Sequence, residues 1–216
     1  MVAAVVFDMD GVIIDSEQVW DEVREELVAD WGGRYRPEAQ RAMMGMSSHE
    51  WSRYLHEVVG LRERPEVINR EVVERMLARY EVELPVVLGA VDAVRRLASA
   101  GYRLAVASSS NRELIDTVLR RLELTALFEI TVSSEEVARG KPAPDVYLEA
   151  ARRLRVEPGR CAAVEDSASG IRAAHLAGMR VIAYPNRHYP PADEVLALAD
   201  ATVTSVADVS RALARA

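Results

Sequence analysis

Residues 4 to 12 read Ala-Val-Val-Phe-Asp-Met-Asp-Gly-Val, an apolar strand that leads directly into two aspartates and a glycine. Side chains alternate along a strand with a period of two, so Asp8 and Asp10 project the same way where the strand ends. Neighbouring carboxylates repel each other and raise each other's pKa unless a cation joins them. A solvated Asp-rich turn is the plainer explanation of such a pair, so the rest of the chain has to decide.

Composition narrows the class of protein. The 216 residues are 50% hydrophobic and 28% charged, enough for one sizeable core or for a domain that carries an insertion. There is no membrane-length apolar run and no basic leader before the first strand, so we expect a cytoplasmic protein. The single cysteine, Cys161, excludes a disulfide within one chain. A net charge of -7 argues against nucleic acid as a partner, and no membrane or protein partner is indicated.

The order of the predicted elements indicates an α/β protein with an insertion. After a strand at 3–8, residues 15–83 show helical periodicity and no convincing strand. Beyond them, short apolar strands alternate with helices, which predicts a Rossmann-like parallel sheet covered by helices on both faces. We expect an α/β catalytic core domain formed by residues 1–14 and 84–216, with an all-helical cap domain at 15–83. The later strands are expected at 103–107, 129–132, 161–164, 180–184 and 201–203.

Capping residues predict where several helices begin. Ser16, Asn111 and Ser167 each precede a segment with helical periodicity, and Ser47 with Glu50 has the spacing of a capping box. Large apolar side chains at helical spacing are expected to pack in the core rather than to contact a ligand. These include Trp20, Trp31, Trp51 and Leu88.

Polar residues follow the predicted strands at the edge where open α/β sheets bind ligands. The second strand leads into Ser108, Ser109 and Ser110, and small hydroxyls at a helix start suit an anion such as phosphate. The fourth strand leads into Glu165 and Asp166. With the two aspartates of the first strand, four carboxylates would converge, which requires a cation. An all-oxygen ligand set favours Mg²⁺ over zinc.

Lys141 is the only lysine among 27 basic residues, and it lies in the run Arg139-Gly-Lys-Pro-Ala-Pro-Asp145. Everywhere else the chain uses arginine as its cation. A surviving surface lysine is one explanation. The other is a site that needs a compact ammonium, which a planar guanidinium cannot replace without moving its contacts.

Four motifs in order make the whole chain resemble the haloacid dehalogenase superfamily. They are Asp8-Met-Asp-Gly-Val12, Ser108 after an apolar strand, Lys141 in Gly-Lys-Pro-Ala-Pro-Asp145, and Glu165-Asp166-Ser167. The resemblance is closest to the branch with a helical cap after the first strand, which holds phosphoglycolate phosphatase-like enzymes and beta-phosphoglucomutase. It implies a magnesium-dependent phosphatase that hydrolyses a small phosphorylated metabolite.

The resemblance also implies a role for each motif residue. Asp8 would be the nucleophile that forms an aspartyl-phosphate, and Asp10 the general acid and then the general base. Mg²⁺ would be held by Asp8, the backbone carbonyl of Asp10, and Asp166 with help from Glu165. The phosphoryl oxygens would be bound by Ser108, the amide of Ser109, and Lys141.

A beta-phosphoglucomutase-like sugar phosphomutase is the main alternative, because it shares the same core. It is disfavoured because Trp20 stands where that enzyme has a histidine, and Ser48 where it has a cap arginine. Cap contacts with the substrate are still expected from Ser47, Ser48 and Arg70. A dehalogenase is a weaker alternative, because dehalogenases of this superfamily lack an acid at the position that Asp10 occupies here. A receiver-like signalling module would have no use for the helical insertion.

Overall fold

The protein is described by a computed structural model, which covers residues 1–214. A six-stranded sheet in the order β3-β2-β1-β4-β5-β6 forms its centre, and every neighbouring pair is parallel. This confirms the predicted α/β class. The strands are β1 (Ala4–Phe7), β2 (Arg103–Ser108), β3 (Ile130–Ser133), β4 (Cys161–Glu165), β5 (Arg180–Ala183) and β6 (Ala201–Thr202).

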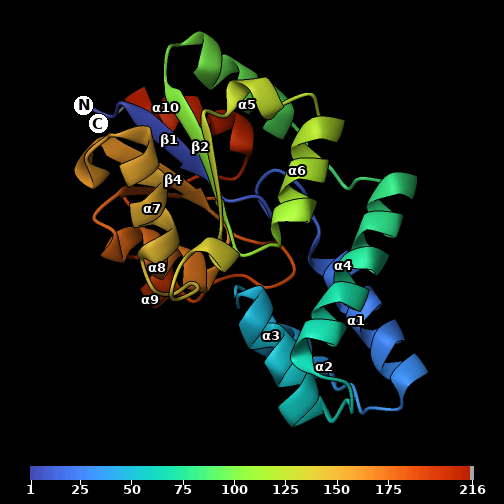
Figure 1. Cartoon of the computed structure of the whole chain (residues 1–216). Helices are drawn as coiled ribbons and strands as arrows, with labels where there is room; N and C mark the ends of the chain where they lie inside the picture. Colours follow the sequence, from blue (N-terminus) through green and yellow to red (C-terminus); the bar gives the residue numbers. More distant parts are fainter. Residues whose placement is uncertain (215–216) are drawn as a thin grey trace.

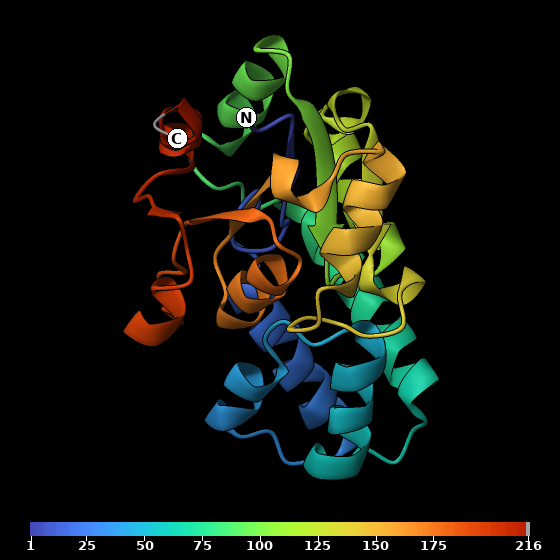
Figure 2. The ribbon, with the colours of Figure 1, turned by 90° about the vertical axis from the view of Figure 1, so that its left-hand side faces the viewer.

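Four helices follow β1 and lie together at one end of the molecule, beyond the sheet, in both views (Figures 1 and 2). They are α1 (Glu17–Trp31), α2 (Pro37–Met43), α3 (Ser48–Tyr54), which continues into a π-helical turn η1 (Leu55–Val59), and α4 (Pro65–Val82). We refer to this group, α1 to α4, as the cap. The domain boundaries at 14/15 and 83/84 stay a prediction.

The remaining helices cover the sheet on both faces (Figure 1). They are α5 (Ala90–Ser99), α6 (Arg112–Arg121), α7 (Asp145–Leu154), α8 (Ala168–Leu176), α9 (Asp193–Leu196) and α10 (Val209–Ala214). Short 3-10 turns are η2 (Thr125–Leu127), η3 (Ser134–Glu136), η4 (Pro158–Arg160) and η5 (Val206–Asp208). Among the described residues, no helix combines the length and the apolar character needed to cross a membrane.

Alternation along β1 divides the core into two layers. Val5 and Phe7 join the apolar cluster that includes α5 and α6, whereas Ala4 and Val6 join the cluster that includes α7 and α8. All four side chains are fully buried, as expected for a central parallel strand. The strand is thus held from both faces and has a fixed direction at its carboxyl end.

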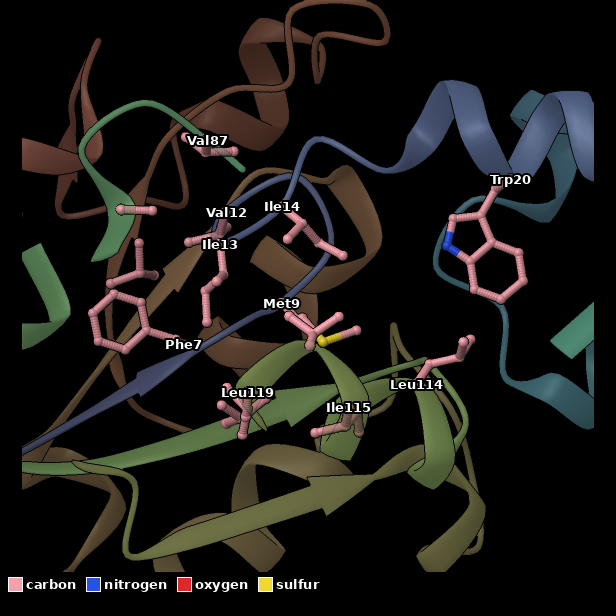
Figure 3. Close-up of a cluster of buried hydrophobic side chains, with 14 of the residues drawn as sticks. Phe7, Met9, Val12, Ile13, Ile14, Trp20, Val87, Leu114, Ile115 and Leu119 are labelled. Atoms are coloured by element: carbon pink, nitrogen blue, oxygen red, sulfur yellow. The ribbon is translucent and has the colours of Figure 1, made fainter. Parts of the chain in front are cut away.

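The turn after β1 is anchored by its own apolar side chains. Met9, Ile13 and Ile14 are fully buried, and Figure 3 shows them near Leu114 and Ile115 of α6. The amides of Ile13 and Ile14 donate to the carbonyl of Met9, at 2.8 and 3.1 Å. These contacts fix the backbone that carries Asp8 and Asp10.

Helices begin after Ser16 and Asn111 as predicted, but the expected side-chain caps and the inward position of Leu88 were wrong. Ser16 and Asn111 occupy N-cap positions, but neither side chain caps its helix; the Ser16 hydroxyl donates to Asp10, and the Asn111 amide donates to Glu135 and Asn69. Leu88 is 93% exposed because α5 begins only after Gly89, so the residue precedes the helix. The capping box of Ser47 and Glu50 and the cap at Ser167 are confirmed.

Candidate active site

Lys141 bridges two acids at the carboxyl edge of the sheet. Its Nζ lies 3.1 Å from Asp8 Oδ1 and 2.6 Å from Glu165 Oε1, and its side chain is 1% exposed. Asp8 follows β1, Glu165 ends β4, and Lys141 comes from the loop between β3 and α7. Burial opposes the charge on Lys141, but attraction from the two carboxylates outweighs it and raises the pKa of the ammonium. The chain's one lysine is therefore a buried, fixed cation.

Both carboxylate oxygens of Glu165 are occupied by donors. Oε1 accepts from Lys141 and from the Tyr147 hydroxyl, the latter at 2.5 Å. Oε2 accepts from Ser167 Oγ at 3.2 Å and from the backbone amides of Asp166 and Ser167. A carboxylate held by so many donors has one orientation, and it fixes the lysine in turn.

Asp8, Glu165 and Asp166 form a buried acidic group that could hold a metal ion. One oxygen from each carboxylate lies within 4.8 Å of the others. Within the described residues, the hydrogen bonds to Asp8 fall on Oδ1 and those to Asp166 on Oδ2, which accepts from Asn186 at 2.7 Å. The other oxygen of each is available to a cation. Gly11 leaves room for this arrangement, because a Cβ there would come within 1.9 Å of Asp166 Oδ2.

The negative charge of this group exceeds what Lys141 balances. Burial and then repulsion from Glu165 raise the pKa of Asp8 well above its usual value, although the lysine opposes the shift. Burial and repulsion from Glu165 and Asp8 raise the pKa of Asp166 in the same way. A divalent cation would offset this repulsion and keep both carboxylates ionised. The residues present therefore fit a hard metal ion.

Asp10 lies beside Ser16, just before the first cap helix, and accepts hydrogen bonds on both oxygens. Oδ1 accepts from Ser16 Oγ at 2.5 Å and from the indole of Trp20 at 3.1 Å. Oδ2 accepts from Ser110 Oγ at 2.7 Å and from Ser108 Oγ at 3.3 Å. Figure 3 shows Trp20 projecting from α1 toward the turn after β1. Trp20 was expected to be a packing residue, and it is buried, but it also links the cap directly to Asp10.

The serines after β2 connect core and cap. Ser108 is fully buried and accepts from the amide of Ser110 at 3.0 Å. The hydroxyl of Ser109 donates to the carbonyl of Gly45 in the cap at 3.0 Å. The structure thus brings the serines to the same edge as Asp10.

A small pocket of about 40 Å³ lies between this edge and the cap. The core contributes Asp8, Asp10, Ser109, Lys141 and Asp166 to its wall. The cap contributes side chains that sequence reasoning missed as site residues, namely Glu17, Arg24, Met43, Met44 and Met46, together with Trp20 and Trp51.

Some of the cap residues that line this pocket could have been recognised from the sequence. Glu17 and Arg24 lie three before and four after Trp20, so all three share one face of α1, and both charged side chains interrupt its apolar stripe. Tyr147 and Asn186, which hold two of the acids, had no comparable signal. Both are brought to the site only by the packing of distant elements.

Ser48 and Arg70, expected to contact substrate, line a second and larger cleft of about 600 Å³ between α3, α4 and the start of α6. Ser48 Oγ donates there to Glu135 Oε1 at 3.1 Å. Ser47 donates to Glu50 within its own capping box. In this conformation none of the three lines the pocket above Asp8.

Comparison with known proteins agrees with the geometry. The family model of haloacid dehalogenase-like hydrolases matches residues 2–178. The chain belongs to the haloacid dehalogenase-like hydrolases. The predicted superfamily and the prediction of an enzyme of this type are thereby confirmed.

Relatives of the chain include phosphatases. A phosphorylated carbohydrates phosphatase of Thermotoga maritima is 33% identical over 180 residues, covering 83% of each chain. Hexitol phosphatase B of Escherichia coli is 32% identical, covering 97% of this chain and 95% of that protein. Among solved structures, CbbY from Rhodobacter sphaeroides in complex with phosphate has a TM-score of 0.84 at 30% identity, covering 97% and 96% of the two chains.

Proposed function

We propose that this hydrolase is a Mg²⁺-dependent phosphatase that hydrolyses a small phosphorylated metabolite through an aspartyl-phosphate on Asp8. The observation that carries the proposal is the position of Asp8. It lies 3.1 Å from a buried lysine and within a buried group of three acids, with a second aspartate two residues further on. The phosphatase relatives support the reaction class.

The first step transfers the phosphoryl group to the enzyme. One oxygen of the Asp8 carboxylate forms a bond to phosphorus as the bond from phosphorus to the ester oxygen breaks. Asp10 donates a proton to the departing alkoxide, which leaves as the alcohol. Lys141 holds the nucleophile in place through Oδ1 and offsets charge on the phosphoryl oxygens, which the Ser108 hydroxyl and the Ser109 amide also bind.

The second step releases phosphate. Asp10, now a carboxylate, takes a proton from a water molecule, whose oxygen bonds to phosphorus as the bond to Asp8 breaks. Inorganic phosphate leaves and Asp8 is regenerated. Mg²⁺, held by Asp8, Asp166 and the backbone carbonyl of Asp10 with Glu165 nearby, would supply charge stabilisation for the phosphoryl oxygens.

The cap would control access to these steps. A pocket of about 40 Å³ admits water but not a sugar phosphate, so the cap has to move for substrate to enter. Asp10 Oδ1 accepts a hydrogen bond from Trp20 of the cap at 3.1 Å and another from Ser16, the residue before α1. Cap opening would break the Trp20 contact with Asp10 Oδ1 and closure would restore it, so closure would orient the Asp10 carboxylate for proton transfer.

The substrate class rests on the relatives, which are named for phosphorylated carbohydrates and hexitols. We infer a small sugar or polyol phosphate. Ser47, Ser48 and Arg70 are retained as proposed cap contacts, the latter two through the larger cleft. The cytoplasmic location stays a prediction.

A panel of phosphorylated metabolites assayed with Mg²⁺ tests the proposal. We expect release of inorganic phosphate from one or more sugar or polyol phosphates, abolished in Asp8→Asn. Beta-glucose 1-phosphate belongs in the panel, because its conversion to glucose 6-phosphate would indicate the phosphomutase alternative. An absence of phosphate release from every ester, with the folded protein and Mg²⁺, would refute a phosphatase.

A further inference from the structure

Arg24 is a buried cation that the proposed reaction does not use. It lies on α1, is 4% exposed, and lines the same pocket as Asp8. Its guanidinium carbon is 4.6 Å from the centre of the Trp20 ring and 5.1 Å from that of Trp51. The two indoles hold the guanidinium in place on the cap side of the catalytic pocket.

Among the described residues, Arg24 has no carboxylate within ion-pair distance. Its Nη1 donates to Gln40 Oε1 at 3.0 Å, and its Nε is buried without a hydrogen-bond partner. Burial accordingly lowers the pKa of the guanidinium, although nearby acids oppose the shift. Buried charges in proteins are normally paired, and the aromatic rings compensate a buried cation only partly.

Glu17, a cap acid whose charge acts on Arg24, is engaged elsewhere. Its Oε2 accepts from Gln40 Nε2 at 3.0 Å, so Gln40 stands between the acid and the guanidinium. Burial and repulsion from Asp10 raise the pKa of Glu17 to about 7, which weakens its charge as a partner for Arg24 near neutral pH. This arrangement leaves the positive charge of Arg24 available to something that enters the pocket.

We propose that Arg24 binds an anionic group of the substrate, a carboxylate or a second phosphate, at the end remote from the phosphoryl group that is transferred. This inference rests on the proposed phosphatase function and narrows its substrate to a phosphate ester with a second negative charge. The guanidinium fork matches either anion, and the Nε–H is a desolvated donor without a hydrogen-bond partner.

Matched pairs of esters test this with the unmodified protein. 3-Phosphoglycerate and glycerol 3-phosphate differ by a carboxylate, and fructose 1,6-bisphosphate and fructose 1-phosphate differ by a second phosphate. In at least one pair, we expect kcat/KM to be tenfold or more higher for the ester that carries the second anionic group. The pair that shows this preference tells whether the second group is a carboxylate or a phosphate. A preference below about threefold in both pairs would overturn the proposal.

Variants then assign the preference to Arg24. Arg24→Gln should lower it by roughly 10- to 100-fold, as loss of a charged hydrogen bond predicts, whereas Arg24→Lys should keep part of it. The matched control is Arg62→Gln, an exposed arginine of the cap, which should keep the wild-type preference. A preference that survives in Arg24→Gln would refute the role.

A binding measurement separates this inference from the proposed function. In an Asp8→Asn background, calorimetry should show 3-phosphoglycerate binding at least tenfold tighter than glycerol 3-phosphate, a difference that disappears on adding Arg24→Gln. Equal binding would contradict the subsite. Loss of all ester turnover in the otherwise wild-type protein, with this binding difference intact, would refute the phosphatase and leave the anion subsite standing. Thermal unfolding of each variant verifies that it is folded.

Discussion

Replacing Lys141 by arginine tests whether the site needs this particular cation. Lys141 lies 2.6 Å from Glu165 and 3.1 Å from Asp8, and its Nζ is 5.1 Å from the centre of the Tyr147 ring. At an effective dielectric of about 20, Coulomb's law gives roughly 6 and 5 kcal/mol for the two contacts, most of it offset by the cost of burying the charges. An arginine keeps the charge but requires more space in a fully packed site.

We expect two results for Lys141→Arg. Overpacking should lower the free energy of unfolding by about 1–3 kcal/mol. Because a planar guanidinium cannot occupy the position of Nζ without displacing the side chains around it, kcat/KM should fall on the order of 100-fold or more. Lys141→Met, which leaves two buried acids unpaired, should cost about 3–5 kcal/mol of stability and nearly all activity.

The measurements are urea unfolding and steady-state hydrolysis of para-nitrophenyl phosphate with Mg²⁺. Arg139→Lys is the matched control, because the Arg139 side chain is 70% exposed and, within residues 1–214, forms an ion pair only with Asp145 at 2.8 Å. It should change stability by less than about 0.5 kcal/mol and leave activity unchanged. Turnover of Lys141→Arg within about threefold of wild type would refute the reasoning and make the lone lysine incidental.

Three further predictions concern the cap and the acidic group. Trp20→Phe removes a hydrogen bond to Asp10 at 3.1 Å while keeping an aromatic ring, so kcat should fall by roughly 3- to 10-fold in steady-state assays; an unchanged kcat would separate the indole from catalysis. Glu17 has its pKa raised from 4.5 to about 7, so the folded state binds more protons than the unfolded state between these values. Stability should therefore decline as pH rises from about 4.5 to 7, and Glu17→Gln should remove up to about 3 kcal/mol of that decline in urea titrations; parallel curves for the two proteins would contradict the shift. Mg²⁺ at about 100 times its dissociation constant should stabilise the protein by roughly 2.7 kcal/mol, and thermal melts of Asp166→Asn should show little of this gain; equal gains would place the ion elsewhere.

The sheet edge that carries the proposed active site could be predicted because strand ends are local features of a sequence. Asp8, Ser108 and Glu165 each follow an apolar run, and parallel strands bring their carboxyl ends to one edge whatever the strand order. The lone Lys141 was visible as a break in an otherwise uniform use of arginine. These signals need no knowledge of how helices pack.

The cap side of the pocket could not be predicted in the same way. Arg24 and Gln40 meet only because α1 and α2 pack together, and their sequence separation says nothing of the contact. Ser16 occupies an N-cap position, but its hydroxyl donates to the carboxylate of Asp10, a stronger acceptor that tertiary structure brings within 2.5 Å. Local rules identify which side chain is available for a hydrogen bond, and the fold decides which partner receives it.

The covalent intermediate tests the central claim most directly. Asp10→Asn would be mixed with para-nitrophenyl phosphate and Mg²⁺, quenched with acid, digested, and analysed by mass spectrometry. Since this variant lacks the base for the second step, we predict that one phosphoryl group accumulates on the peptide containing Asp8, and that Asp8→Asn shows none. Phosphorylation at another residue, or wild-type turnover by Asp8→Asn, would contradict the account.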